Sequence, residues 1–330
     1  MERFLITCEP TNESHVYKGK DFRISVLSDR LFRIELGKAD AFEDRPTQTV
    51  LCRSFATPDV DFSLKGANLT VTTNSVVLKF NTQIKTVKIK DRKTNAYLST
   101  KGNLGGTRRT LDMRLGAVDL GKGLMAKGGV SMFDDGKSLV LEGGMVVPRK
   151  KVKDYYIFAH NHDYLGCLKD FYNLTGKVPV IPKFALSNWW SRYFPYSEES
   201  YLALMDEFIS RKIPITVATI DMDWHLVKEV PKEYKGSNIF LGRGWTGYTW
   251  NKKLFPDPQR FLKALKDRGF WTTLNIHPAD GIRAFEDPYP EMARAMGIDP
   301  ATKKTVEFDL TDKKFLLAYF DVLHRPFEKD

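Results

Sequence analysis

The first half of the chain alternates apolar and polar residues in short runs. The segment 22–37, FRISVLSDRLFRIELG, places two such runs around a Ser-Asp turn, and residues 68–99 hold several more runs separated by turns with Asn and Asp. Alternation with a period of two is typical of strands with one buried face, and many short strands favour an antiparallel sandwich. We therefore predict a β-sandwich over residues 1–150, in which the Gly-rich segment 102–112 is a loop.

Beyond about residue 180, apolar runs of strand length alternate with stretches of helical periodicity. The predicted strands are 183–190, 215–221 and 270–281. Their nearly all-apolar composition is typical of strands buried on both faces of a parallel sheet that helices cover. This pattern favours a doubly wound sheet or the first part, about three βα units, of a (β/α)8 TIM barrel. No GxGxxG or GxxxxGK motif follows a strand, which argues against a nucleotide-binding fold.

Capping residues mark the ends of the predicted helices. The first helix has Ser197 as its N-cap, carries apolar residues at helical spacing, and stops before Pro214. The second has Asp257 as its cap, a proline at its first position, and Gly269 just past its end. A third helical pattern begins at Thr311. Ser and Asp accept hydrogen bonds from free amides at a helix start, and glycine suits a helix end.

Composition narrows the range of partners. The net charge of +10 raises the question of nucleic-acid binding, but the basic residues are spread out. In the segment 85–101 lysines alternate with apolar residues, as on the solvated face of a sheet, so we expect no nucleic-acid partner. No apolar run approaches the roughly 20 residues that cross a bilayer, and the N-terminus lacks a signal-peptide pattern. Three scattered cysteines favour a reducing, cytoplasmic setting.

Polar and aromatic side chains gather where the predicted strands end. The second strand runs directly into Asp221, Asp223, Trp224 and His225. On an extended segment the two carboxylates would share one face about 7 Å apart. Carboxylates accept sugar hydroxyls and indole rings cover sugar C–H patches, and five of the six tryptophans lie within residues 189–250. The pattern predicts a carbohydrate site, although either carboxylate could instead cap the loop or pair with Arg192.

Three further polar segments have less specific patterns. His160 and His162 lie beside Asp163 at a spacing that suggests a metal site, but no further ligand is near in sequence, so we expect no metal. The segment FDD at 133–135 lies in the sandwich half, and the sequence assigns no role to Asp134 and Asp135. Residues 285–300 have the pattern of a helical hairpin inserted over the mouth of a barrel.

Four segments, in order, resemble glycoside hydrolase family 31, the α-glucosidase and α-xylosidase family: FALSNWWSRY, IDMDWH, GWTGYTWNKKLFPDP and LNIHPADGI. The resemblance implies a galactose-mutarotase-like sandwich over 1–150, a lead-in segment at 151–182, and an incomplete catalytic (β/α)8 barrel over 183–330. It also implies a retaining, exo-acting hydrolase of terminal α-linked sugars. An oligosaccharide or α-glycoside would be its substrate, and it would need no cofactor.

The resemblance further implies roles for single residues. Asp221 matches the aspartate that ends barrel strand 2 and hydrogen-bonds the sugar in subsite −1. Trp224, Tyr193 and His277 match other positions that line this pocket. Asp223 matches a second acid in the loop, to which no role is assigned.

In the family the nucleophile follows barrel strand 4, and the acid/base aspartate follows a later strand. The third predicted strand ends near Ile276 and its helix reaches about Leu323, so we expect both catalytic carboxylates beyond Asp330 and an inactive chain. A complete barrel takes roughly 250 residues, which agrees with this expectation. The alternative is a non-catalytic carbohydrate-binding fragment or a split-enzyme partner. The sugar, its linkage and the oligomeric state stay open.

Overall fold

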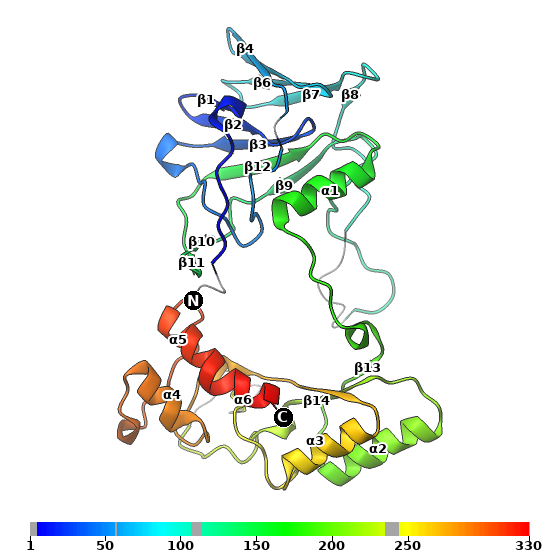
Figure 1. The fold of residues 1–330 in the computed structure, drawn as a ribbon, viewed down its shortest axis with the longest axis vertical. Coiled ribbons are helices and arrows are strands. Elements are labelled where there is room, and N and C mark those ends of the chain that lie inside the picture. Colours follow the sequence, from blue (N-terminus) through cyan, green and yellow to red (C-terminus); the bar gives the residue numbers. More distant parts are fainter. Residues whose placement is uncertain (1–4, 57, 107–113, 235–243, 330) are drawn as a thin grey trace. The chain divides into compact units, whose positions relative to one another are not determined.

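The structure is a computed structural model. It describes residues 5–56, 58–106, 114–234 and 244–329. The chain divides into two compact units, Met1–Pro179 and Val180–Asp330 (Figure 1). Residues 107–112 of the predicted Gly-rich loop lie outside the described residues.

Two five-stranded antiparallel sheets form most of the first unit. One sheet has the order β1 (Val16–Lys18), β2 (Phe22–Val26), β3 (Leu31–Leu36), β12 (Lys153–Phe158) and β9 (Ser131–Asp134). The other has the order β4 (Asp61–Lys65), β5 (Asn68–Thr72), β6 (Val76–Asn81), β7 (Val87–Asp91) and β8 (Tyr97–Leu98). A separate hairpin pairs β10 (Val140–Glu142) with β11 (Met145–Val147).

The two sheets share one hydrophobic core. Ile24 and Phe32 from the first sheet and Leu78 and Phe80 from the second are buried in the same cluster. The rings of Phe22 and Phe80 meet across it with centroids 4.9 Å apart. Because alternate residues of a strand point to opposite faces, the apolar positions of both sheets fill the space between them. The alternation in the sequence therefore correctly predicted a β-rich first domain.

The segment 151–182 contributes to the first unit. It contains β12, which pairs antiparallel with β3 and with β9 and so lies inside the first sheet. It also contains helix α1 (Tyr164–Thr175), whose N-cap Asp163 accepts a hydrogen bond from the amide of Gly166. The boundary between the two units follows this helix, at Pro179.

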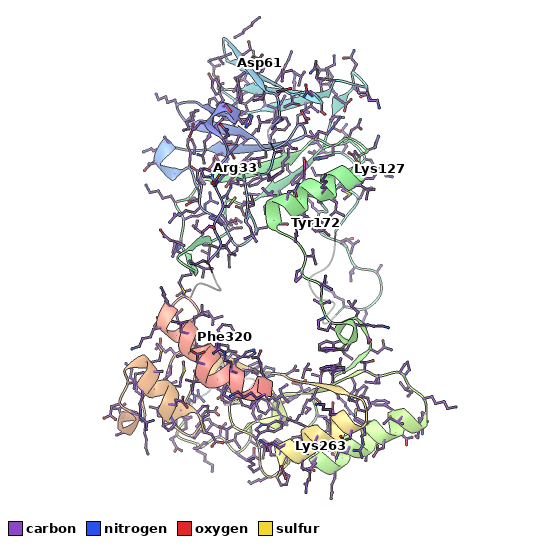
Figure 2. The ribbon with its side chains drawn as sticks, in the orientation of Figure 1. Arg33, Asp61, Lys127, Tyr172, Lys263 and Phe320 are labelled. Carbon is purple, nitrogen blue, oxygen red and sulfur yellow. The ribbon has the colours of Figure 1, made fainter. Side chains whose placement is uncertain are left out.

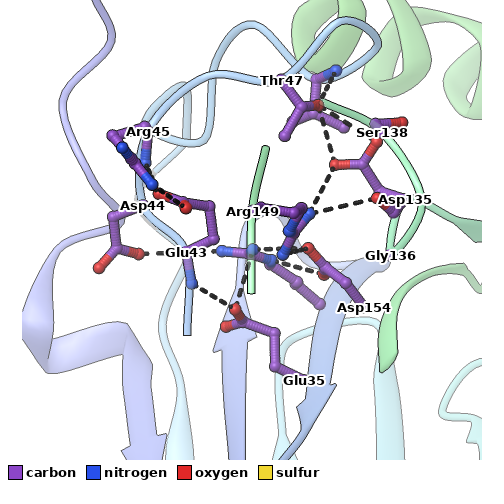
Figure 3. Close-up of polar contacts among 12 residues, drawn as sticks. Glu35, Glu43, Asp44, Arg45, Thr47, Asp135, Gly136, Ser138, Arg149 and Asp154 are labelled. Carbon is purple, nitrogen blue, oxygen red and sulfur yellow. Dashed lines mark hydrogen bonds and ion pairs between the residues drawn. The ribbon is translucent and has the colours of Figure 1, made fainter. Parts of the chain in front are cut away.

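Charged side chains are buried on the other face of the first sheet (Figures 2 and 3). Along β3, Phe32 belongs to the core, whereas Arg33 and Glu35 point the opposite way and are only 1% and 0% exposed. Figure 2 labels Arg33 among the side chains of the first unit. The Arg33 guanidinium donates two hydrogen bonds to the Asp154 carboxylate of β12, at 2.8 and 2.7 Å, and lies 2.9 Å from Glu35. Arg23 forms a second ion pair with Glu35.

A loop residue closes this ion cluster. Arg149 lies 3.1 Å from the Asp154 carboxylate and 3.7 Å from that of Asp135, which also accepts a hydrogen bond from the Thr47 hydroxyl (Figure 3). Burial opposes ionisation of Asp154, but the neighbouring guanidiniums outweigh it and hold the pKa of its carboxyl below the ordinary value. Asp135, from the FDD segment, is therefore a member of a buried ion cluster inside the first unit.

The second unit has a three-stranded parallel sheet with the order β13-β14-β15. Its strands are β13 (Trp189–Trp190), β14 (Val217–Ile220) and β15 (Trp271–Leu274). Its helices are α2 (Glu198–Ser210), α3 (Pro258–Asp267), α4 (Tyr289–Met296), α5 (Lys313–Ala318), the π-helical turn η8 (Tyr319–His324) and α6 (Arg325–Lys329). No helix in the described part of the chain is long and apolar enough to cross a membrane.

The sequence predicted the capped helices of this unit well. Ser197 caps α2 with its hydroxyl, and Asp257 caps α3 by accepting a hydrogen bond from the amide of Arg260. The predicted helix at 311 begins as α5 and continues through the π-helical turn. Residues 285–300 contain the single α-helix α4 followed by a short 3-10 turn, so the predicted helical hairpin is wrong.

Two of the predicted strands differ from the structure. The apolar run 183–190 is mostly not strand, since Lys183–Leu186 form a 3-10 turn and only the last two residues pair with β14. The strand β14 is buried along its whole length, as predicted, whereas β15 is partly exposed throughout. The apolar composition of these runs predicted neither where each strand begins and ends nor whether both of its faces are buried.

Candidate functional site

The predicted site begins where β14 ends. Asp221 is half-buried, and its carboxylate accepts a hydrogen bond from the amide of Met222 at 2.7 Å, which starts the 3-10 turn η5 (Met222–Trp224). Asp223 lies within this turn and is 7% exposed. The prediction that both carboxylates share one face of an extended segment is therefore wrong, because residues two apart in a 3-10 turn point in different directions.

The two acids differ in their exposure to solvent. Loss of solvent raises the pKa of the Asp223 carboxyl, and the nearby charges of Glu229 and Asp221 act in the same direction. Asp221 keeps access to solvent at the carboxyl end of the strand. Of the two, Asp221 is the carboxylate that a polar ligand can reach.

Trp224 fixes the end of β14 to the end of β15. Its side chain is fully buried, and its indole N–H donates a hydrogen bond to the carbonyl of Asn275 at 2.7 Å. The ring packs edge-on against Trp250, with centroids 4.9 Å apart. Trp224 thus holds the two strand ends in register.

Two histidines and an indole lie beside these strand ends. The ring of His277, just after β15, lies 6.2 Å from that of His225 and 4.8 Å from that of Trp245. The amide of His277 donates to the carbonyl of Thr246 at 3.3 Å, which joins the loop around Trp245 to β15. Asp221 follows β14 and His277 lies just beyond the paired parallel strand β15, so these groups lie at the same edge of the sheet.

Both histidines are neutral near pH 7. Burial lowers the pKa of His225 to about 4 and also lowers the pKa of His277. Among the described residues, three buried ring nitrogens in this region have no hydrogen-bond partner: Nε2 of His225, Nδ1 of His277 and Nε1 of Trp245. Buried polar atoms are nearly always paired in folded proteins. Unpaired atoms that gather near a carboxylate therefore mark a place for a polar ligand.

Tyr193 and Arg192 lie in the segment after β13. Tyr193 is exposed, and the structure shows no contact between it and the Asp221 region within the described part of the chain. The Arg192 guanidinium lies over the ring of Phe194 at 4.8 Å. The alternative in which Arg192 pairs with Asp221 is therefore not found among the described residues.

Glu286 is a buried acid that sequence reasoning missed. It is 3% exposed, and its Oε1 accepts hydrogen bonds from the hydroxyl of Thr246 and, at 3.5 Å, from the amide of Gly247. Burial raises the pKa of its carboxyl to about 7. The amide of the next residue, Asp287, donates to the Thr249 hydroxyl at 2.8 Å. The segment before α4 thereby holds the loop that carries Trp245.

Gly247 is required where this loop passes His225. Its φ is +136°, and a Cβ at this position would lie 3.0 Å from the His225 ring. The segments GWTGYTWNKKLFPDP and 285–300 contain Gly247 and Glu286, but the sequence assigned neither residue a role, because their partners come from distant segments. A backbone position with positive φ and no side-chain space admits only glycine.

His160 and His162, in the segment AHNHDY, do not lie at a common site. His160 pairs with Asp170 at 3.0 Å, and His162 contacts the carbonyl of Lys127 at 3.0 Å. Asp163 caps α1. In the described ranges, no group of three or more His, Cys, Asp or Glu side chains is placed to hold a metal ion.

Comparison with known proteins agrees with this architecture. Residues 178–327 match the family model described as the glycosyl hydrolases family 31 TIM-barrel domain. An alpha-xylosidase of Saccharolobus solfataricus is 28% identical over 132 residues, which cover 40% of this chain and 16% of that protein. An alpha-glucosidase 2 of Bacillus thermoamyloliquefaciens is 27% identical over 147 residues, which cover 44% of this chain and 15% of that protein.

Solved structures extend the similarity to both units. A family 31 dextranase of Flavobacterium johnsoniae, complexed with glucose, superposes with a TM-score of 0.57 at 17% identity, covering 86% of this chain and 39% of that one. A family 31 alpha-xylosidase from a soil metagenome, complexed with xylose, gives a TM-score of 0.56 at 12% identity, with 86% and 48% covered. This chain thus spans under half of each of these two structures.

The chain has the fold of a β-rich N-terminal domain followed by part of a TIM barrel. Residues 178–327 therefore resemble the barrel domain of glycoside hydrolase family 31, and the matched relatives are alpha-xylosidases and an alpha-glucosidase.

Proposed function

We propose that the second unit is the part of a family 31 α-glycosidase barrel that binds the terminal sugar of an α-linked substrate. The observation that carries this proposal is the group of unpaired nitrogens on His225, His277 and Trp245 in the region of Asp221. A sugar offers several hydroxyls that both donate and accept hydrogen bonds. A neutral imidazole can donate or accept a hydrogen bond, an indole N–H donates and a carboxylate accepts, so these groups supply complementary partners for the hydroxyls.

The five residues predicted from the sequence would contribute in different ways. Asp221 would accept hydrogen bonds from the sugar hydroxyls, and His277 would bind the sugar through its free ring nitrogen. Trp224, fully buried, would act by holding the strand ends in place. Tyr193, which is exposed and has no contact with the Asp221 region in the described residues, would contact only a part of the substrate outside that region, and Asp223 would shape the turn.

Hydrolysis itself requires two carboxylates on opposite sides of the anomeric carbon, about 5 Å apart in a retaining enzyme. Asp221 and Asp223 do not meet this requirement, because Asp223 is buried within the turn. We propose that the nucleophile and the acid/base residue belong to sequence beyond Asp330. The names of the matched relatives favour xylose or glucose as the terminal sugar.

Asp221 provides the test. A chain extended to a full barrel is expected to hydrolyse p-nitrophenyl α-xyloside or α-glucoside, whereas the 330-residue chain is not. In the extended enzyme, Asp221→Asn should lower kcat/KM about 10- to 100-fold, because hydrogen bonds to a charged group contribute roughly 1.5–3 kcal/mol. Asp206→Asn, on the exposed surface of α2, is the matched control and should change kcat/KM less than twofold, in the range of about 0.5 kcal/mol for surface substitutions.

Two results would contradict the proposal. Turnover by the 330-residue chain would show that its catalytic carboxylates lie within these residues. An extended enzyme unaffected by Asp221→Asn would show that Asp221 only caps its turn. Calorimetry of the short chain with glucose, xylose and isomaltose separates a binding fragment from one that needs the rest of the barrel to bind sugar.

A further inference from the structure

Two of the three cysteines lie together in the first unit. The amide of Arg53, the residue after Cys52, donates a hydrogen bond to Sγ of Cys8 at 3.1 Å. Burial and a side-chain hydrogen bond with Cys52 raise the pKa of the Cys8 thiol. Both cysteines are half-buried, whereas Cys167 is 3% exposed and belongs to a hydrophobic cluster that contains neither of them.

The backbone on both sides of this pair is held in place. The amides of Leu51 and Cys52 both donate to the carbonyl of Leu174, at 2.9 and 3.1 Å. The hydroxyl of Thr11 donates to the carbonyl of Arg53 at 3.0 Å, which ties the segment that carries Cys8 to the segment that carries Cys52. These contacts, with the hydrogen bond from the Arg53 amide to the Cys8 sulfur, bring the segments that carry the two cysteines together.

Arg53 connects this pair to the interior of the unit. Its side chain is 2% exposed, and its Nε donates to the hydroxyl of Tyr156 at 2.7 Å. Its Nη1 donates to the carbonyl of Arg45 at 2.8 Å. The residue next to Cys52 is thus anchored on β12, and the contact with Cys8 fastens the N-terminal segment to that anchor.

We propose that Cys8 and Cys52 form a redox-modification site, at which a low-molecular-weight disulfide of the glutathione class converts the two thiols into a reversible intramolecular disulfide. One cysteine thiolate attacks the small disulfide, which forms a mixed disulfide and releases one small thiol. The second thiolate attacks the protein sulfur of the mixed disulfide, and the other small thiol leaves. The protein loses two electrons and two protons, and the small disulfide is reduced to two thiols.

The bridge would restrain the unfolded chain between the N-terminal segment and the Arg53 segment. A disulfide stabilises mainly by this restraint, provided that its geometry is met without large backbone movement. The Cys8 sulfur already lies 3.1 Å from the amide nitrogen of Arg53, the residue after Cys52, so the two segments are held close before any bridge forms. We expect the bridged protein to melt about 5–10 °C above the reduced protein.

The test uses the full chain and oxidised glutathione. Intact-mass measurement should show the loss of two hydrogens, and non-reducing peptide mapping should join the peptide of Cys8 to that of Cys52. Dithiothreitol should reverse both results. Separate glutathione adducts on the two cysteines, a bridge to Cys167, or a disulfide between two chains would each overturn the proposal.

Serine variants make the assignment specific. Cys8→Ser and Cys52→Ser should each retain one glutathione adduct on the remaining partner, because no second thiol is near to displace it. Cys167→Ser is the matched control and should form the bridge as the unaltered chain does. A bridged protein with an unchanged Tm would overturn the stabilising effect.

Discussion

Replacing Arg33 by methionine is expected to lower the free energy of unfolding of the first unit by about 3–5 kcal/mol. Arg33 supplies the cation that Asp154 and Glu35 share, at 2.7 and 2.9 Å, and all three side chains are almost completely buried. Methionine fills much of the same volume without charge. It would leave the buried Asp154 carboxylate with one close guanidinium, that of Arg149, instead of two, and removing one partner of a buried ion pair is costly.

Urea unfolding followed by far-UV circular dichroism measures this loss. Lys18→Met is the matched control, since Lys18 forms an ion pair with Glu13 in which both side chains are more than half exposed. Exposed pairs contribute about 0–1 kcal/mol. An Arg33→Met variant as stable as the Lys18→Met variant would show that the buried cluster adds nothing beyond what packing supplies.

The pH dependence of the free energy of unfolding provides a second test of this prediction. The pKa of Asp154 in the folded state lies below its ordinary value, so its contribution to stability is fully present above the pKa of the unfolded chain, about 3.9. That contribution is lost as the pH falls through the lower, folded pKa. The difference between the unaltered chain and Arg33→Met should therefore shrink as the pH is lowered below about 4.

This cluster also shows which features of the fold a sequence pattern can predict. The alternation of apolar and polar residues along β3 correctly places Phe32 and Arg33 on opposite faces of the sheet, because successive side chains in a strand point to alternate faces. Alternation does not tell whether the polar face meets water or another part of the chain. Here Asp154 and Arg149 cover it, more than a hundred residues away in sequence. The sheet was predictable, but the burial of its charged face was not.

In the second unit too, features set by local interactions were predictable from the sequence, whereas features set by distant contacts were not. Ser197 and Asp257 cap helices through amides a few residues away, so the sequence predicted both helix starts. Asp221 was predictable as a polar residue that ends a buried strand. The turn that separates it from Asp223, and the acid Glu286, depend on contacts that no short segment encodes.

Replacing Glu286 by glutamine is expected to stabilise the second unit progressively as the pH rises. In the folded chain the pKa of Glu286 is about 7, against an ordinary value of 4.5. The folded state therefore holds more protons than the unfolded state between these values, and stability falls as the pH rises through this window. Glutamine is uncharged and keeps the oxygen that accepts from Gly247. Its advantage should grow by about 2–3 kcal/mol between pH 5 and pH 8.

The comparison between variants removes an effect of opposite sign from His225. Its folded pKa of about 4 lies below its ordinary 6.5, so its contribution to stability rises with pH over that interval. Both the unaltered chain and Glu286→Gln contain His225, and its contribution cancels in their difference. Tryptophan fluorescence during urea unfolding reports on this unit alone, because all six tryptophans lie within residues 189–271.

Glu291→Gln is the matched control, since Glu291 is exposed on the adjacent helix α4. As a substitution at an exposed position, it should change the free energy of unfolding by no more than about 0.5 kcal/mol at either pH. If Glu286→Gln instead destabilises the unit equally at pH 5 and pH 8, Glu286 must be ionised in the folded state at both values. The hydrogen bonds from Thr246 and Gly247 would then outweigh burial, and the loop that carries Trp245 would be held by a charge rather than by a neutral acid.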